Sequence, residues 1–271
     1  CEELNFVPRE KYTHAPEILQ HCHNIGKHYD LYNRACLQTQ VTGMSWEETQ
    51  KRWIIKTDRG DAMQARFVIM SNGPLNRPKL PGIPGITEFE GHTFHTSRWD
   101  YDYTGGTSEG NLERLADQRV AIIGTGATAV QCIPHLGAAA KSLHVFQRTP
   151  SSIDVRANRP TDSDWAKSLP KGWQKARMEN FNALTSGRIV EEDLVMDGWT
   201  EIIRNLISMA NYRGKDIDPR EIPKLMEMAD FQKMEQIRAR VDAIVEDPKT
   251  AEALKPYYRQ FCKRPCFHDN Y

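Results

Sequence analysis

A glycine-rich turn at residues 120–131, VAIIGTGATAVQ, has the spacing that lets a backbone hold phosphate groups. Gly124 allows a tight turn, Gly126 lets the backbone approach a pyrophosphate, and Ala129 is small enough for a helix to pack on a strand. The turn follows an apolar strand and opens a helix, whose free N–H groups would face the phosphates. The pattern predicts a dinucleotide site, and the alternative is a glycine-rich turn without a ligand. The residues expected to contact the dinucleotide are Gly124, Thr125, Gly126, Ala127, Thr128 and Gln131.

The end of the next strand, SLHVFQRTP, indicates which dinucleotide is bound. An NAD site carries an acidic residue about 20 positions after the glycines, where it accepts a hydrogen bond from the ribose 2′-OH. This chain has Gln147, Arg148 and Thr149 there, with Arg148 24 residues after Gly124. A guanidinium can bind a 2′-phosphate through two hydrogen bonds, whereas a carboxylate would repel it. The sequence therefore predicts NADP(H), with a surface arginine as the alternative.

The elements around this turn predict an α/β fold. Strands at 119–124 and 142–147 with a helix from 127 to about 136 form a βαβ unit. Upstream we expect a helix at about 16–29 and an antiparallel meander from LQTQVTGMSW, RWIIKTDRG and AMQARFVIMSNG, with a turn at 58–61. Four prolines in the segment 73–85 predict a stiff connector.

The chain after Pro160 has the composition of helices. Asp218-Pro219-Arg220-Glu221 predicts a helix start with an aspartate cap, and Asp247-Pro248 predicts another. An apolar stripe follows the first start, and we expect it to be buried: Leu225, Met228, Met234, Ile237, Val241 and Ile244.

Composition excludes several classes of protein. The 36 basic and 36 acidic residues cancel, so no global charge attracts nucleic acid or an anionic membrane. No apolar run reaches the length of a membrane span, and CEELNFVPRE lacks the features of a signal peptide. Six scattered cysteines do not form a disulfide scaffold, so we expect free thiols and a cytoplasmic location. We expect no metal site, because His21 and His23 point to different helix faces and Cys262, Cys266 and His268 lack zinc spacing.

A second pattern precedes the glycine turn. Phe89, Gly91, His95, Trp99 and Asp100 in FEGHTFHTSRWD fit F-x-G-x-x-x-H-x-x-x-W-[P/D], and the segment resembles the flavin-dependent Baeyer–Villiger monooxygenases. The similarity continues through NGPLNRPKLPGIPG, GTGATAVQ, FQRTP and CKRP, and the first of these looks like the branch that acts on steroids and polycyclic ketones.

The resemblance implies a flavoprotein with two dinucleotide-binding, Rossmann-like domains, in which NADPH reduces FAD and O2 supplies an oxygen atom inserted beside a ketone carbonyl. It implies a catalytic role for Arg264, a permanently charged donor that stabilises anionic oxygen where water is excluded. It also implies that Lys263 joins Arg148 and Thr149 around the 2′-phosphate. His95 is interpreted as a structural linker between the nucleotide domains rather than as a base.

The resemblance further implies that the chain is an internal fragment of an enzyme of about 500 to 650 residues. We expect residues 1–88 to belong to the FAD-binding domain with its meander and linker, and 89–160 to the NADP-binding βαβ domain. Residues 161–255 would form a helical insertion, and 256–271 would return to the NADP domain. The fragment alone is expected to bind FAD poorly and to self-associate through open sheet edges. The alternatives are an N- or S-oxidising flavin monooxygenase and a truncated NADP-binding module without oxygenation.

Overall fold

The computed structural model describes residues 2–73, 75, 77–188, 190–212, 218, 220–263 and 265–271, with the backbone alone at 210–212 and 261. The chain divides into two compact units. The smaller unit is Ile18–Arg98, and the larger unit combines Cys1–Glu17 with Trp99–Tyr271. Each unit is described separately below.

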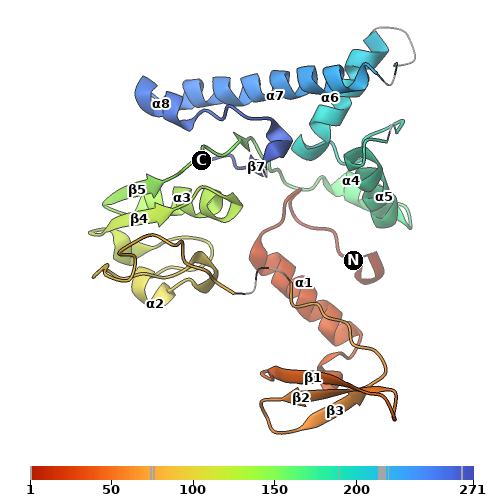
Figure 1. The fold of residues 1–271 in the computed structure, drawn as a ribbon. Coiled ribbons are helices and arrows are strands. Elements are labelled where there is room, and N and C mark those ends of the chain that lie inside the picture. Colours follow the sequence, from red (N-terminus) through yellow and green to blue (C-terminus); the bar gives the residue numbers. More distant parts are fainter. Residues whose placement is uncertain are drawn as a thin grey trace. The chain divides into compact units, whose positions relative to one another are not determined.

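The smaller unit holds most of α1 (Ala15–His28) and a three-stranded antiparallel meander in the order β1 (Val41–Glu47), β2 (Arg52–Thr57) and β3 (Ala62–Ala65) (Figure 1). The predicted helix and meander are confirmed. The β2–β3 turn lies at the predicted residues, and Gly60 there has a φ of +78° that other residues adopt only with strain.

The third strand is shorter than the β-forming residues of the sequence suggest. Ala65 pairs with Trp53, and β2 begins at Arg52, so the chain beyond Ala65 runs past the end of its neighbour. Phe67, Ile69 and Met70 are therefore outside the sheet, with exposed fractions of 81%, 89% and 68%. The expectation that the strand includes these residues is wrong for the described structure.

The larger unit is built on the predicted βαβ element. Strands β4 (Arg119–Ile123) and β5 (Ser142–Phe146) pair in parallel, and α3 (Ala127–Ala139) connects them (Figure 1). The carboxyl ends of both strands therefore meet at one edge. One face of α3 joins a buried apolar core made of Leu112, Leu115, Ile122, Ala129 and Leu136.

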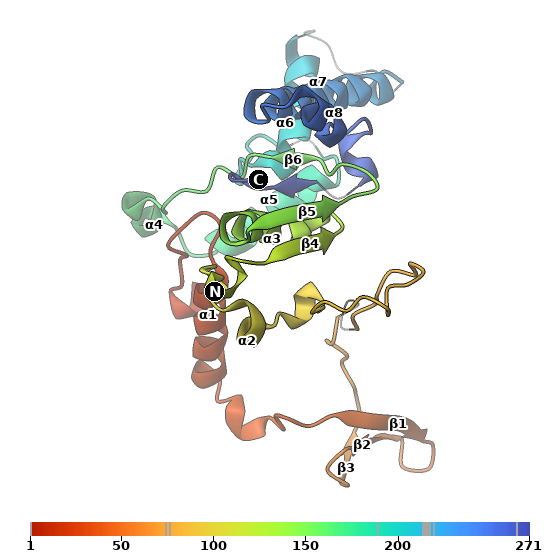
Figure 2. The ribbon, with the colours of Figure 1, turned by 90° about the vertical axis from the view of Figure 1, so that its left-hand side faces the viewer.

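A second pair of parallel strands packs against another face of α3. Strand β6 (Ile153–Asp154) pairs with β7 (Cys266–Phe267), and Figure 2 shows the pair beyond β5. Val130 of α3 packs with Ile153 and Cys266 in a second core. The segment after β5 and the segment near residue 266 are thus held side by side.

One of the remaining helices precedes β4, and the others follow the change of composition after Pro160. They are α2 (Tyr101–Thr104), α4 (Ser163–Ser168), α5 (Trp173–Thr185), α6 (Gly198–Tyr212), α7 (Ile222–Ile244) and α8 (Pro248–Leu254). Short 3-10 helices lie at Glu2–Leu4, Tyr32–Arg34, Thr96–Arg98, Glu113–Leu115 and Gln260–Cys262. Consecutive helices from α5 to α8 pack on one another.

The two predicted helix starts differ in outcome. Asp247 caps α8 by accepting a hydrogen bond from the N–H of Thr250 at 2.8 Å, as expected. The start at Asp218 is wrong, because α7 begins at Ile222 and the Asp218 carboxylate instead binds Arg220. The carboxylate is satisfied locally, because the backbone N–H of Arg220 also donates to it at 2.9 Å.

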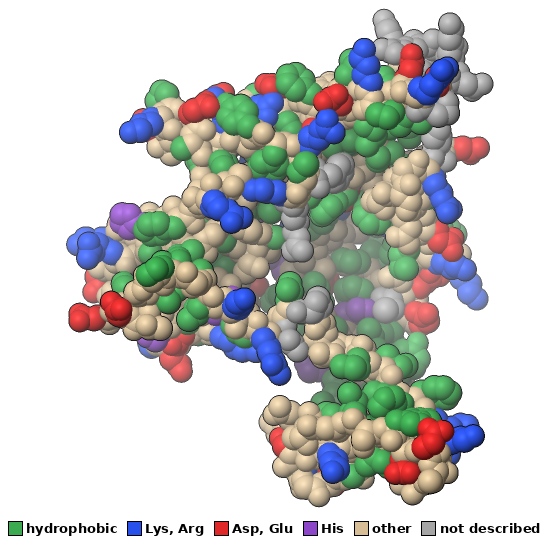
Figure 3. All heavy atoms as spheres, in the orientation of Figure 1, with side chains coloured by type: hydrophobic (Ala, Val, Ile, Leu, Met, Phe, Trp, Pro, Cys, Tyr) green, Lys and Arg blue, Asp and Glu red, His purple; other side chains and the backbone are tan. Residues whose placement is uncertain are grey.

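The predicted apolar stripe of α7 is partly buried. Leu225, Met234 and Ile237 are in the core, whereas Met228 and Ile244 are 45% and 54% exposed. Figure 3 shows the exposed apolar side chains of this helical region among basic and acidic side chains, which are interspersed over the visible face.

Candidate functional site

The glycine turn lies at the carboxyl edge of the parallel strands β4 and β5. The N–H of Gly124 donates to the carbonyl of Phe146 at 2.8 Å, which extends the β4–β5 pairing into the turn. Gly124 has a φ of +100°, a conformation that side-chain-bearing residues rarely adopt. The predicted role of this glycine in a tight turn therefore matches its backbone.

The start of α3 is open for an anion. Gly126 precedes the helix, no side chain caps its first turn, and an added Cβ at Gly124 or Gly126 would meet no atom within 4 Å in the described chain. The first N–H groups of a helix have no partner within the helix and carry partial positive charge. This opening fits the phosphates of a dinucleotide. Ala127 is half-buried, and Thr128 is exposed at the same turn.

Thr125 and Ser151 join the glycine turn to the segment that follows β5. The buried Thr125 hydroxyl lies 3.5 Å from the carbonyl oxygen of Thr149, and Ser151 donates to the Thr125 carbonyl. Because Arg148 directly precedes Thr149, its backbone is held next to the turn. The structure thus brings these predicted residues together.

The side chains of Arg148 and Gln131 are both exposed. No hydrogen bond or ion pair joins the Arg148 guanidinium to another residue within the described ranges. The Gln131 amide donates to the Ala127 carbonyl of its own helix at 3.0 Å. A permanently charged group is therefore presented to solvent at the edge where the turn opens.

Lys263, near the carboxyl end of the chain, is connected to the segment after β5 through Tyr258. Its ammonium lies 4.9 Å from the centroid of the Tyr258 ring. The Tyr258 hydroxyl donates to the carbonyl of Pro150 at 2.9 Å and accepts from the N–H of Ser152 at 2.8 Å. Lys263 is thereby linked to the strand end that carries Arg148. Arg264, the predicted catalytic residue, lies outside the described residues.

Helix α7 contacts both the segment that precedes Lys263 and strand β6. Asp230 accepts a hydrogen bond from the N–H of Gln260 at 2.8 Å. Lys233, only 4% exposed, lies 2.5 Å from Asp154 of β6 and 2.7 Å from Glu201 of α6. Burial alone would lower the pKa of Lys233, but its hydrogen bonds to these two carboxylates raise it. The helices after Pro160 are thus joined to the strands by a charged buried contact.

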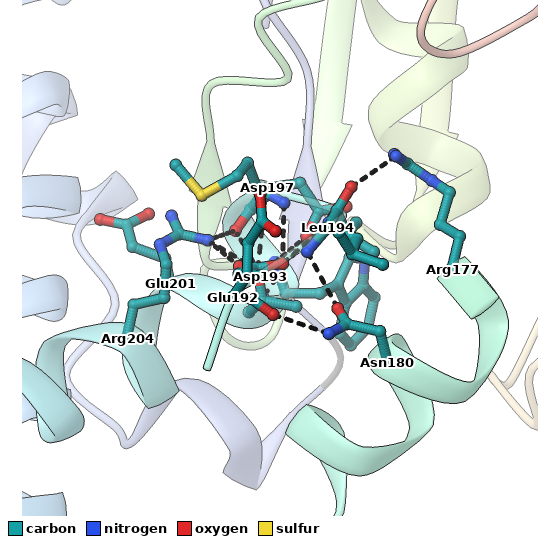
Figure 4. A network of polar contacts seen from close by, with 12 residues as sticks. Arg177, Asn180, Glu192, Asp193, Leu194, Asp197, Glu201 and Arg204 are labelled. Atoms are coloured by element: carbon teal, nitrogen blue, oxygen red, sulfur yellow. Dashed lines mark hydrogen bonds and ion pairs between the residues drawn. The ribbon is translucent and has the colours of Figure 1, made fainter. Parts of the chain in front are cut away.

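A separate polar cluster lies between α5 and α6 (Figure 4). Asp193, 9% exposed, accepts hydrogen bonds from the Thr200 hydroxyl, from Arg204 at 2.5 Å and from the N–H groups of Val195 and Met196 at 2.9 Å. Burial alone would raise the pKa of Asp193, but these hydrogen bonds lower it to about 2. Every acceptor position of this carboxylate is used inside the chain.

The residues of the second motif fall on both sides of the unit boundary. In the smaller unit, the Phe89 ring covers Gly91 so closely that a Cβ there would lie 2.5 Å from it, and His95 binds the Ser97 hydroxyl at 2.8 Å. In the larger unit, Asp100 caps α2, and the Trp99 indole donates to Thr104 at 3.0 Å. Each residue has a local structural contact.

The described residues form neither a membrane-spanning helix nor a cluster suited to a metal ion. Their helices include no segment long and apolar enough to cross a membrane. Their histidine, cysteine, aspartate and glutamate side chains form no group of three or more suited to a metal ion.

Sequence reasoning missed Tyr258, Ser151 and Ser152. They have no motif spacing relative to the glycines, since Tyr258 lies 108 residues after Pro150. The consecutive serines after FQRTP are the one local signal that could have suggested backbone contacts there.

Curated relatives match the whole chain. Neopentalenolactone D synthase of Streptomyces avermitilis is 59% identical over 270 residues, which are 100% of this chain and 46% of that protein. A Baeyer–Villiger monooxygenase of Stachybotrys chlorohalonatus is 55% identical over 273 residues, covering 100% of this chain and 43% of that protein. The chain spans about half the length of the curated relatives it matches.

Solved structures share the fold. The polycyclic ketone monooxygenase of the fungus Thermothelomyces thermophila aligns with a TM-score of 0.85 at 38% identity, covering 100% of this chain and 46% of that one. OTEMO in complex with FAD and NADP aligns with a TM-score of 0.70 at 25% identity, covering 98% of this chain and 50% of that one. The predicted fold class is confirmed.

A family model of the pyridine nucleotide-disulphide oxidoreductases matches residues 2–183. The chain belongs to this family, and its resemblance to the Baeyer–Villiger monooxygenases is confirmed.

Proposed function

We propose that this chain is the NADPH-binding middle part of a Baeyer–Villiger monooxygenase. The whole enzyme would use FAD, NADPH and O2 to insert an oxygen atom next to a ketone carbonyl and form an ester or lactone. The observation that carries the proposal is the 55% identity of the entire chain to a protein named as such a monooxygenase. The open glycine turn supports the nucleotide part of the proposal independently.

The chain's own residues have distinct roles in this proposal. The N–H groups at the start of α3 bind the pyrophosphate, and the absence of side chains at Gly124 and Gly126 lets it approach. Arg148, Thr149 and Lys263 bind the 2′-phosphate. Arg264 is the catalytic residue, because a guanidinium stays protonated and can stabilise anionic oxygen in a site that excludes water. FAD, when bound, carries the electrons from NADPH and activates O2.

The substrate class we propose is a polycyclic ketone. It is supported by the likeness to the polycyclic ketone monooxygenase, which is 38% identical over the whole chain. The experiment uses the full-length protein that contains this chain, with NADPH oxidation and product formation measured on cyclohexanone, a fused bicyclic ketone and a steroid ketone. We expect ester or lactone formation with the fused ketones and its loss in Arg264→Ala.

The same assay separates the alternatives. Oxidation of an amine or a thioether without ester or lactone formation would favour an N- or S-oxidising flavin monooxygenase. Tight NADPH binding by a protein without flavin and without turnover would favour a binding module. Arg264→Ala with unchanged product formation would contradict the catalytic role of that residue.

We further infer that 1–88 belongs to an FAD-binding domain, 89–160 to the NADP domain, 161–255 to a helical insertion and 256–271 to the NADP domain again. The division of the chain after Arg98 supports a role of the second motif as a linker, because it separates His95 from Trp99. If His95→Ala leaves hydride transfer and oxygenation rates unchanged in the full-length protein, the linker role is refuted.

We also propose that residues 1–271 alone bind FAD poorly and self-associate, and that the whole protein acts in the cytoplasm. The exposed apolar side chains after β3 support the first point, and the absence of a disulfide among the described cysteines supports the second. Stoichiometric flavin and a monomeric sedimentation profile of the purified piece would contradict self-association. Cell fractionation tests the location.

A further inference from the structure

Tyr258 makes two polar contacts through one hydroxyl group. It donates to the Pro150 carbonyl at 2.9 Å and accepts from the N–H of Ser152 at 2.8 Å, and Ser152 is 1% exposed. Both contacts lie directly after Thr149. The hydroxyl therefore fixes the path of the backbone that leaves Arg148 and Thr149.

The ring of the same tyrosine contacts Lys263. The ammonium lies 4.9 Å from the ring centroid, within the range of a cation–π interaction. Lys263 is itself exposed and would otherwise sample many rotamers. One side chain thus contacts both Lys263 and the backbone directly after Arg148 and Thr149, the three residues proposed to bind the 2′-phosphate.

The environment of Tyr258 keeps the hydroxyl protonated. A phenol of ordinary pKa is already protonated at neutral pH, and burial raises the pKa of Tyr258 further, so the proton donated to Pro150 is retained. Other hydrogen bonds also hold the neighbouring backbone, since the N–H of Gln260 donates to the Asp230 carboxylate at 2.8 Å and the N–H of Cys266 donates to the Ser152 carbonyl at 2.9 Å. Loss of the hydroxyl should therefore alter the local geometry without unfolding the segment.

We propose that Tyr258 is a positioning residue that holds Lys263 and the Arg148–Thr149 segment at the separation that a single 2′-phosphate bridges. This inference rests on the proposed NADPH site. The tyrosine contacts no phosphate itself. It acts by limiting the freedom of groups that do, so it should affect discrimination between NADPH and NADH more than the binding that both cofactors share.

The adjacent tyrosine is a matched control. The Tyr257 hydroxyl donates to Glu252 at 2.7 Å, and the Arg238 guanidinium lies 5.1 Å from the centre of its ring. Tyr257 thus combines a hydroxyl hydrogen bond with a cation on the ring, as Tyr258 does. Tyr257 is 67% exposed, and within the described chain its hydroxyl forms no hydrogen bond with Pro150 or Ser152.

The test measures the Kd of NADPH and of NADH by calorimetry on the full-length flavoprotein. Tyr258→Phe keeps the ring and removes two hydrogen bonds, so we expect the Kd of NADPH to rise about 5- to 10-fold. Tyr258→Leu also removes the ring and should raise it about 10- to 50-fold. The Kd of NADH should change less than about twofold in both variants, and Tyr257→Phe and Tyr257→Leu should leave the ratio of the two constants unchanged.

Two results separate this inference from the proposed NADPH site. If Arg148→Ala removes the preference for NADPH but Tyr258→Phe retains it, the phosphate site stands and the positioning role is overturned. If neither variant changes the preference, both are overturned. Lys263→Met supplies a coupling test, because Tyr258→Leu should add little to its effect when the tyrosine acts through the lysine. Full additivity would contradict the proposal, and Tyr258→Phe decides the matter if the leucine variant does not fold.

Discussion

The glycine turn and the Asp193 cluster use polar groups in opposite ways. At the turn, the start of α3 is uncapped, and the Arg148 side chain is exposed. At the Asp193 cluster, four donors from the same chain surround one buried carboxylate (Figure 4). The first arrangement leaves charge and N–H groups for a ligand, whereas the second satisfies them within the fold.

Because of this difference, we expect the glycine turn to contribute to ligand binding and the Asp193 cluster to contribute to the stability of the fold. Buried polar groups that are fully hydrogen-bonded stabilise a fold, and removing one partner leaves the others unsatisfied. Uncapped N–H groups in contact with solvent contribute little until an anion binds them. Substitutions at the Asp193 cluster should therefore change stability alone, and substitutions at the turn should change cofactor binding.

Asp193→Ala is expected to have the largest effect on stability. It removes the carboxylate partner of Arg204, which keeps only the Thr200 hydroxyl and the Asp197 carbonyl, and it leaves two N–H groups without their acceptor. It should lower the free energy of unfolding by about 3 kcal/mol. Urea unfolding of the full-length protein measures this loss, and the preference for NADPH should not change. Asp164→Ala is the control, because Asp164 pairs with Lys167 at 3.6 Å on the exposed surface and should contribute less than about 0.5 kcal/mol. A comparable loss of unfolding free energy in both variants would mean that the Asp193 cluster stabilises the fold no more than an exposed ion pair does.

Arg148→Asp should have the largest effect on binding. Replacing a donor pair by a repelling carboxylate should raise the Kd of NADPH about 100-fold, and Arg148→Ala should raise it about 10-fold. The Kd of NADH should change little, and the unfolding midpoint should not move. Arg119→Ala is the matched control, because Arg119 is also exposed but begins β4 at the opposite end of the strand from the turn. Equal weakening of both cofactors would refute the assignment of Arg148.

Acid should weaken the Asp193 cluster. The pKa of Asp193 in the folded chain is about 2, below its ordinary value of 3.8, so its contribution is present above pH 3.8 and is lost as the pH falls toward 2. The shift corresponds to about 2 kcal/mol. Thermal unfolding of the wild type and of Asp193→Asn between pH 6 and pH 3 checks this. The stability difference between them should narrow as the pH falls, and a constant difference would contradict the shifted pKa.

The sequence predicted the glycine turn well because its constraints are local. Gly124 and Ala129 are required by a backbone conformation and by one helix–strand contact, and both depend on neighbours within a few residues. The cluster at Asp193 has no such spacing. Its partners come from a loop and from α6, and only packing shows that this aspartate is buried while Asp164 is exposed.

The missed residues of the site have the same explanation. Tyr258 reaches Pro150 because β6 pairs with β7, a contact between segments more than 100 residues apart. The short β3 has a related cause, since β-forming residues such as Ile69 become a strand only where a neighbour pairs with them. Propensity identified these segments, and tertiary pairing decided their conformation.

The two glycines of the turn provide the smallest and sharpest test. Gly124→Ala forces a side chain into a φ of +100° and should cost about 1 to 2 kcal/mol of stability. Gly126 has a φ of −73° with open space around its Cβ position, so Gly126→Ala should change the free energy of unfolding by less than about 0.5 kcal/mol. The added methyl group would lie where the pyrophosphate approaches, and it should weaken NADPH and NADH equally because both carry that group. Calorimetry and urea unfolding of the two variants measure these effects separately. Unchanged binding by Gly126→Ala would mean that the opening at the start of α3 does not hold the dinucleotide.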